Sequence, residues 1–236
     1  MKPLPPPETY EQELVYWPYR ESIKTVVQIL CAVAQKSAKV LDLMCGPGYL
    51  QGQLLQQRPD LSLHGVDIEQ SYVEHGMKKY PQAHFEVGDV LTWKPQRKFD
   101  VITCTGALHH LPYERQGELI HNMASWLNPS GTAILSDCYI DDYSNELERK
   151  LGAAKLGYEY LAATIRNGAP DEVIEACTDI IANDVLKDEF KTSLGKRLPK
   201  VKRHFDHHGI TKTWPEHSEE GTYGDYIFVL LGPKNN

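Results

Sequence analysis

Apolar and polar positions along the chain follow two different rhythms. Up to about residue 137, short apolar runs alternate with segments in which apolar residues recur every three or four positions. Short apolar runs are typical of buried strands, and the longer period is that of amphipathic helices. Repeated strand–helix alternation with short connections predicts βαβ units and a mostly parallel sheet. The expected strands are 39–44, 62–67, 83–87, 99–104 and 132–136, and the expected helices are 23–34, 49–57, 70–80 and 114–127.

The rhythm changes after residue 140, where only helical periodicity continues to about residue 207. A strand pattern returns at 210–214 and 226–231, and a polar loop between these runs predicts an antiparallel pair. We therefore expect an α/β fold in which a doubly wound sheet of seven strands ends in an antiparallel strand and carries a helical cap insertion. The expected divisions are an N-terminal tail or lid (1–20), a cofactor-binding core (21–140), the cap (141–207) and the closing strands of the core (208–236).

Composition narrows the class of protein. The chain has 236 residues, of which 41% are hydrophobic and 24% charged, which is ordinary for a folded globular protein. The net charge of −7 disfavours a nucleic-acid partner, and no apolar run approaches the ~20 residues of a membrane span. The five cysteines are widely spread and form no C-x-x-C pair. This spacing favours a reduced, cytoplasmic protein without a disulfide framework or a zinc site, so we assign no metal ligand.

The most informative stretch is V-L-D-L-M-C-G-P-G at residues 40–48. Here the first strand runs into a loop containing Gly46 and Gly48, and a helix follows at once. Doubly wound sheets bind nucleotides at this carboxyl end of a strand. The loop lacks the Gly-Lys-Ser/Thr of a phosphate loop and the three glycines of a dinucleotide fingerprint. Because Asp42 would repel phosphates, the loop suits a cationic ligand.

One further acid ends the second strand, and another follows the third strand. Asp67 lies 19 residues after Gly48, near the spacing of about 20 at which a carboxylate takes ribose hydroxyls. Asp89 follows the third strand, where a carboxylate can accept the exocyclic amine of an adenine. Together these acids predict an adenosine site beside a positively charged group.

The pattern D-x-x-C-G-x-G, the acid closing strand two and the G-D after strand three resemble class I S-adenosylmethionine-dependent methyltransferases. The similarity covers about residues 38–137 and the closing strand pair. It implies a Rossmann-like core, S-adenosylmethionine as cofactor, S-adenosylhomocysteine as product, and transfer of a methyl group to a small-molecule acceptor by in-line displacement. The cofactor contacts that the resemblance implies are Asp42, Gly46, Gly48, Thr105 and Gly106 for the methionine part, Asp67 for the ribose, Asp89 and Val90 for the adenine, and Ile68 beside them.

Aromatic residues before the first core helix have two interpretations. In this family such a segment often folds over the cofactor, so Tyr19 and Arg20 could reach the methionine carboxylate, which arginine binds in a bidentate manner. Alternatively, the segment is a hydrophobic latch that packs onto the inserted helices.

Chemistry at the acceptor side is expected after strands four and five. His109 and His110 follow strand four, and a histidine has the right pKa range if the acceptor must lose a proton. The alternative is that one histidine packs under the loop and the other caps the next helix. For the acceptor pocket we expect Asp137, Tyr139, Tyr143 and Tyr158, which otherwise serve as loop and cap residues.

Three other functions remain open. The stretch W-P-Y at 17–19 is consistent with an enzyme similar to carboxy-S-adenosylmethionine synthase. A non-catalytic S-adenosylmethionine-binding partner protein is a second option. Methylation of RNA or protein is disfavoured by the acidic charge. The sequence leaves the acceptor undetermined, and it allows a homodimer through the cap helices.

Overall fold

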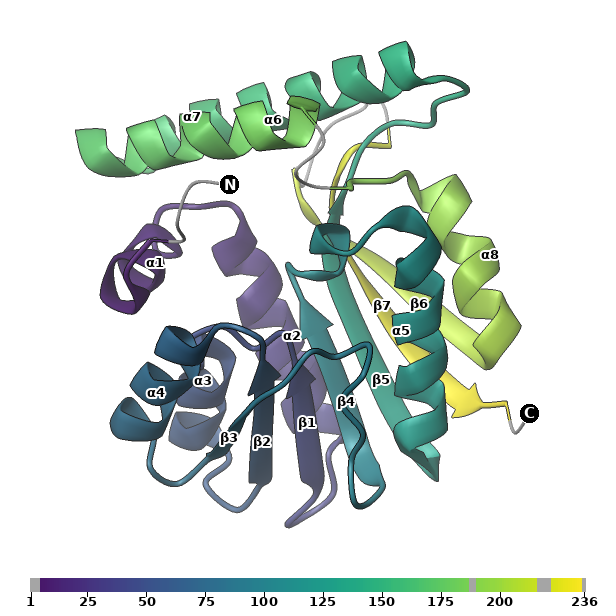
Figure 1. Cartoon of the computed structure of the whole chain (residues 1–236). Coiled ribbons are helices and arrows are strands. Elements are labelled where there is room, and N and C mark those ends of the chain that lie inside the picture. The colour runs from purple at the N-terminus through teal and green to yellow at the C-terminus, as the bar shows by residue number, and fades with distance from the viewer. Residues whose placement is uncertain (1–4, 187–189, 216–221, 235–236) are drawn as a thin grey trace.

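The computed structural model describes residues 5–186, 190–215 and 222–234. Within them, a seven-stranded sheet with the order β3-β2-β1-β4-β5-β7-β6 forms the centre of the molecule (Figure 1). β1 to β5 are parallel, and β7 pairs antiparallel with both β5 and β6. The expected α/β fold, with its antiparallel last strand, is confirmed. The strands are β1 (Lys39–Leu43), β2 (Ser62–Asp67), β3 (His84–Val87), β4 (Phe99–Thr105), β5 (Leu127–Tyr139), β6 (Phe205–Trp214) and β7 (Gly224–Pro233).

Helices cover both faces of the sheet. Ile23, Val26 and Leu30 of α2 are buried, because spacings of three and four residues place them on one side of the helix. No helix in the described part of the chain is long and apolar enough to cross a membrane. One face carries α2 (Tyr19–Val33), α3 (Tyr49–Gln57) and α4 (Gln70–Lys79), and the other carries α5 (Tyr113–Trp126) and α8 (Leu194–His204).

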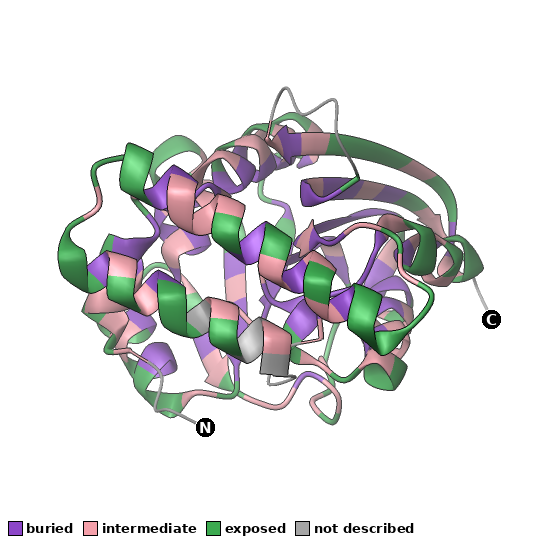
Figure 2. Cartoon of the chain, turned by 90° about the horizontal axis from the view of Figure 1, so that it is seen from above, coloured by how far each residue is buried: buried purple, intermediate pink, exposed green. Residues whose placement is uncertain are grey.

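Two helices of the inserted region form a cover. α6 (Glu146–Arg166) and α7 (Asp171–Leu186) pack against each other across the carboxyl ends of the parallel strands (Figures 1 and 2). α8, the third helix expected in the cap, packs instead beside α5 on the sheet, because Leu194, Leu198 and Val201 face the main core. The division of the chain into tail, core and cap stays a prediction, with α8 in contact with the core.

The N-terminal segment is helical from Pro7 and lies beside α4. Helix α1 (Pro7–Glu13) has proline in its first turn, where the missing N–H costs nothing. The Tyr72 hydroxyl of α4 donates to the Pro5 carbonyl at 3.0 Å, and Lys79 of α4 pairs with Glu11. This segment therefore covers the carboxyl ends of the strands, where the glycine loop lies.

Candidate active site

The glycine loop joins β1 to α3 and has the backbone that its sequence predicts. Gly46 and Gly48 have φ values of +54° and +91°, in the left-handed region. A Cβ at Gly48 would lie 2.7 Å from the Phe85 ring, so that position also lacks room for a side chain. The Gly46 amide donates to Asp67 Oδ2 at 2.8 Å, which fixes the loop against the end of β2.

Asp42 lies beneath this loop and is only 3% exposed. Its carboxylate accepts hydrogen bonds from Thr103 Oγ1 at 2.6 Å and Gln51 Nε2 at 3.1 Å. Burial raises the pKa of Asp42 to about 7, although both hydrogen bonds act in the opposite direction. A cation bound at the loop would favour the ionised carboxylate.

The ends of β2 and β3 combine polar and apolar groups. Asp67 also accepts from the Glu69 amide at 2.9 Å, and burial raises the pKa of its carboxyl group. The next side chain, Ile68, is 69% exposed, which is unusual for a large apolar residue. Asp89 accepts from the Leu91 amide at 2.9 Å and so begins a turn, while Val90 is buried. The carboxyl end of β2 thus offers the Asp67 carboxylate beside the exposed apolar surface of Ile68, as an adenosine site needs.

The aromatic segment brings Tyr19, but not Arg20, to this edge. A Cβ at Gly106 would meet the Tyr19 ring at 2.7 Å, so the ring lies directly on the loop after β4. Burial raises the pKa of Tyr19 well above its ordinary value. Arg20 instead donates to the Val15 carbonyl at 2.9 Å and to Glu21 at 3.2 Å. It lines a separate cavity of about 250 Å³ between the start of α2 and the end of α6, which gives no support to its predicted contact with the cofactor.

His109 lies in the short 3₁₀ helix η1 (Leu108–His110) that follows β4, and it pairs with a carboxylate of β5. Its Nδ1 is 2.6 Å from Asp137 Oδ1, and both side chains are buried. Because an ionised carboxylate only accepts, Nδ1 donates the hydrogen of this bond. Gly106 lies at the start of the same loop, and its backbone N–H donates a hydrogen bond to the Ser136 carbonyl of β5 at 2.8 Å.

Arg197 is the cation that balances the charge of Asp137. Arg197 of α8 is also buried, and its Nη2 lies 4.0 Å from Asp137 Oδ2. Burial opposes ionisation, but His109 and Arg197 hold the pKa of Asp137 below its ordinary value. Cys138 Sγ lies 3.9 Å from His109 Nδ1, so these donors are also close enough to surround a metal ion. Because Arg197 already supplies a positive charge there, we favour a histidine oriented by an ionised aspartate over a metal site.

The other residues expected at the acceptor side lie in different environments. His110 is exposed, with its ring centroid 4.3 Å from that of His109. Tyr143 is partly buried beneath Lys196, whose Nζ is 4.5 Å from the ring centroid. Tyr139 is fully buried in the main core, because β5 continues to this residue and turns it toward α8. Tyr158 is 67% exposed on the outer side of α6. The predictions that Tyr139 and Tyr158 line a pocket are therefore not supported.

A buried polar cluster beneath α6 was not predicted as a site. Asp225, the second residue of β7, is paired with Cys138 and is buried. The Tyr160 hydroxyl of α6 donates to Asp225 Oδ2 at 2.6 Å, and Ser22 Oγ donates to the same oxygen at 3.5 Å. Burial raises the pKa of Asp225 to about 7. The only sequence signal was an acid at the start of an apolar strand, which does not reveal its partners.

Comparisons with known proteins agree with this geometry. Residues 40–131 match the model of the methyltransferase domain. Trans-aconitate 2-methyltransferase of Escherichia coli is 30% identical over 112 residues, which cover 47% of this chain and 44% of the relative. Two solved structures share the fold. The plantazolicin methyltransferase BpumL has a TM-score of 0.63 at 13% identity, and the match covers 91% of this chain and 85% of the BpumL chain. The N-methyltransferase NodS of Bradyrhizobium japonicum has a TM-score of 0.58 at 14% identity, and the match covers 91% of this chain and 87% of the NodS chain.

Residues 40–131 match a methyltransferase domain, and the chain shares the fold of the two solved methyltransferase structures. The matched region spans less than half the length of the Escherichia coli relative.

Proposed function

We propose that this protein transfers the methyl group of S-adenosylmethionine to a small-molecule acceptor. The observation that carries the proposal is the pair of acids, Asp42 and Asp67, around a left-handed glycine loop that has no phosphate cradle. The methyltransferase domain match over residues 40–131 supports it, as does the likeness to trans-aconitate 2-methyltransferase and to structures solved with S-adenosylhomocysteine.

The residues at the carboxyl edge fit this cofactor. Asp42 supplies negative charge for the ammonium and sulfonium groups, and its partner Gln51 has a buried Oε1 without a hydrogen-bond partner in the structure. Asp67 is placed to accept from ribose hydroxyls, and Ile68 offers an apolar surface to the adenine. Tyr19 and α1 exclude water from the loop side.

At the acceptor side, His109 acts as a general base. The cofactor, when bound, supplies an electrophilic methyl group on sulfur. An acceptor O–H or N–H would give its proton to the His109 imidazole, and its lone pair would bond to the methyl carbon as the carbon–sulfur bond of the cofactor breaks and S-adenosylhomocysteine leaves. Asp137 stabilises the imidazolium formed, and Arg197 keeps Asp137 ionised. Asp137 and Arg197 are positioning residues, because both are buried behind the histidine.

Calorimetry with S-adenosylhomocysteine tests the cofactor assignment. We expect binding of one molecule per chain, and Asp67→Ala should weaken it because a ribose partner and the Gly46 anchor are lost. Ile29→Val, on α2 away from the loop, is a matched control. Absence of binding would refute the proposed function. Mass spectrometry of the co-purified ligand then distinguishes the plain cofactor from the carboxylated one of the synthase alternative.

The outer surface of α6 supports a homodimer through the cap. Its exposed apolar side chains include Leu147, Leu151, Tyr158 and Ile165 (Figure 2 shows the exposed turns of the cover). Light scattering should report a dimer, and Leu151→Lys should shift it toward monomer. A monomer at all concentrations would contradict dimerisation. The free cysteines among the described residues support a cytoplasmic location, and the charge of −7 supports the expectation of no nucleic-acid partner.

A further inference from the structure

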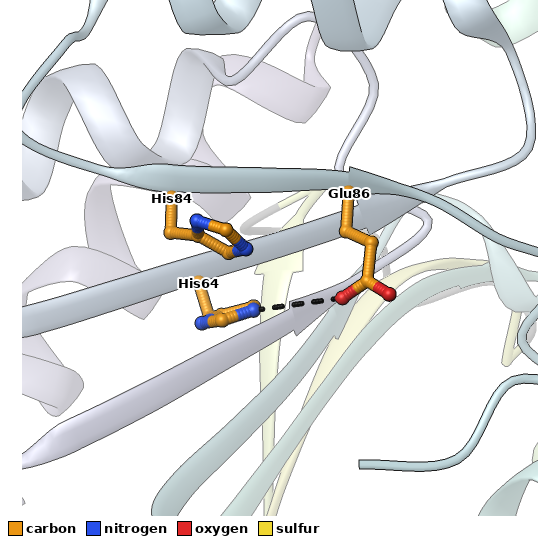
Figure 3. A group of neighbouring side chains, drawn as sticks. All are labelled: His64, His84 and Glu86. Atoms are coloured by element: carbon orange, nitrogen blue, oxygen red, sulfur yellow. Dashed lines mark ion pairs between the residues drawn. The ribbon is translucent and has the colours of Figure 1, made fainter. Parts of the chain in front are cut away.

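A second cluster of chemically active side chains lies between β2 and the edge strand β3. His64 of β2 and His84 and Glu86 of β3 point to the same side (Figure 3). Residues 88–98, which connect β3 to β4, form no helix, so this part of the sheet is not covered as the rest is. A cleft of about 810 Å³ opens there, and Trp93 and Arg97 line it together with the cluster.

Strand register explains why these residues meet. His64 is paired with His84, and Val66 is paired with Glu86. Side chains two positions apart in a strand share a face, so His84 and Glu86 project beside His64 and away from α3 and α4. The two imidazole centroids are 4.1 Å apart, and His64 Nε2 lies 3.8 Å from Glu86 Oε2. One donor atom from each of the three residues lies within 4.8 Å of the others.

We propose that His64, His84 and Glu86 form a binding site for a divalent transition-metal ion of the zinc class. Zinc holds imidazole nitrogen and carboxylate oxygen at about 2.0–2.2 Å, so the donors of a bound ion lie roughly 3.3–3.5 Å apart. Small side-chain rotations bring the present donors to that spacing. The Glu86 side chain is 46% exposed and has room to turn, whereas His64 is 15% exposed and provides a fixed ligand.

The donor set and its surroundings favour such an ion over calcium or magnesium. Two imidazoles and one carboxylate are typical of zinc and its neighbours, while calcium and magnesium prefer oxygen ligands alone. The open cleft leaves a fourth position for water or an anion.

Arg97 occupies part of this site in the structure. Its Nη2 lies 3.4 Å from His64 Nδ1, and the guanidinium is 5.7 Å from the Phe99 ring centroid. Arginine only donates, so His64 Nδ1 accepts and Nε2 carries the hydrogen toward Glu86. A metal ion at Nε2 requires the opposite tautomer, with the hydrogen on Nδ1 and Arg97 turned away. Arg97 therefore competes with the ion, and its removal should tighten binding.

The test uses the metal-free full chain without an affinity tag. Calorimetry with Zn²⁺ and the absorption spectrum with Co²⁺ should report one tight site, and Mg²⁺ should not compete for it. His84→Ala and Glu86→Gln should each weaken Zn²⁺ binding by about tenfold or more, because each removes a ligand. Arg97→Gln should strengthen binding several-fold.

The chain also offers a matched control. His121 and His204 form another histidine pair, with ring centroids 5.0 Å apart. His121→Ala should leave Zn²⁺ binding at the tight site unchanged. Circular dichroism checks that the variants fold, which we expect because His84 and Glu86 lie on the exposed edge strand. Failure to bind Zn²⁺, or equal weakening by His121→Ala and His84→Ala, would overturn the site. Since neither cofactor nor acceptor is present, that outcome would leave the proposed function standing.

Discussion

Replacing the buried Asp42 by asparagine should make the protein more stable at neutral pH while weakening its cofactor site. The folded state raises the pKa of Asp42 from 3.8 to about 7. A shift of about 3 units corresponds to roughly 4 kcal/mol, at about 1.36 kcal/mol for each unit. Between these two pH values the unfolded chain releases the proton and the folded chain keeps it. The stability of the wild-type protein therefore falls as pH rises from about 4 to about 7, and asparagine removes this loss.

The hydrogen bonds around Asp42 tolerate the change. Thr103 can still donate to the remaining oxygen of the new side chain. The Gln51 amide can turn so that its Oε1, now without a partner, accepts from the new amide group. The substitution Asp42→Asn should thus cost little packing energy.

Urea unfolding at pH 5 and pH 8 measures the effect. The stability of Asp42→Asn relative to wild type should rise by about 3 kcal/mol between these pH values, since about 2 pH units of the titration lie between them. Glu13 and Asp225, whose pKa values are also raised to about 7, are present in both proteins and cancel in the comparison. Cofactor binding should weaken, because a neutral amide does not attract the ammonium group. An identical pH dependence in the two proteins would refute the reasoning.

Three further substitutions probe the site. His109→Gln should lower kcat about 100- to 10,000-fold and leave cofactor affinity unchanged, and rapid-quench kinetics with an identified acceptor measures both; unchanged kcat would exclude a base role. Gly106→Ala should destabilise the protein by roughly 1–2 kcal/mol in thermal unfolding, because φ is +60° and the Tyr19 ring occupies the Cβ position; a neutral effect would contradict this contact. Tyr160→Phe should cost about 1–3 kcal/mol in urea unfolding at pH 8, where Asp225 loses its donor; equal loss at pH 5 and pH 8 would contradict an ionised partner.

Local patterns predicted the sheet and the glycine loop because their causes are local. Alternating strand and helix periods lead to parallel pairing, and the two glycines in the loop after β1 permit the left-handed backbone at Gly46 and Gly48. Asp42 and Asp67, near the carboxyl ends of β1 and β2, converge because parallel strands end at the same side of the sheet. Gly46 bonding to Asp67 follows from that convergence.

Side-chain direction and long-range partners could not be predicted in the same way. Tyr139 is buried because β5 runs three residues past its expected end, and Tyr158 faces outward because of the rotation of α6. Arg20 is turned by its neighbour Glu21 and the Val15 carbonyl.

His64 and His84 lie side by side because the register of β2 and β3 pairs them, and this register could not be predicted from the sequence. The absence of a metal site was predicted from cysteine spacing alone, so histidine pairs of this kind escaped notice.

The bonds from α2 to the last two strands have a consequence for the order of folding. Ser22 bonds Thr213 across 191 positions and Asp225 across 203. β7 lies between β5 and β6, and about 85 residues separate Tyr139, which ends β5, from Gly224. At a synthesis rate of about 5–20 residues per second, β5 is synthesised roughly 4–17 s before its partner strand β7, and its outer edge stays unpaired during that time. α6, α7, α8 and β6 are all made in that interval, so they emerge before β7 is available to pair with β5.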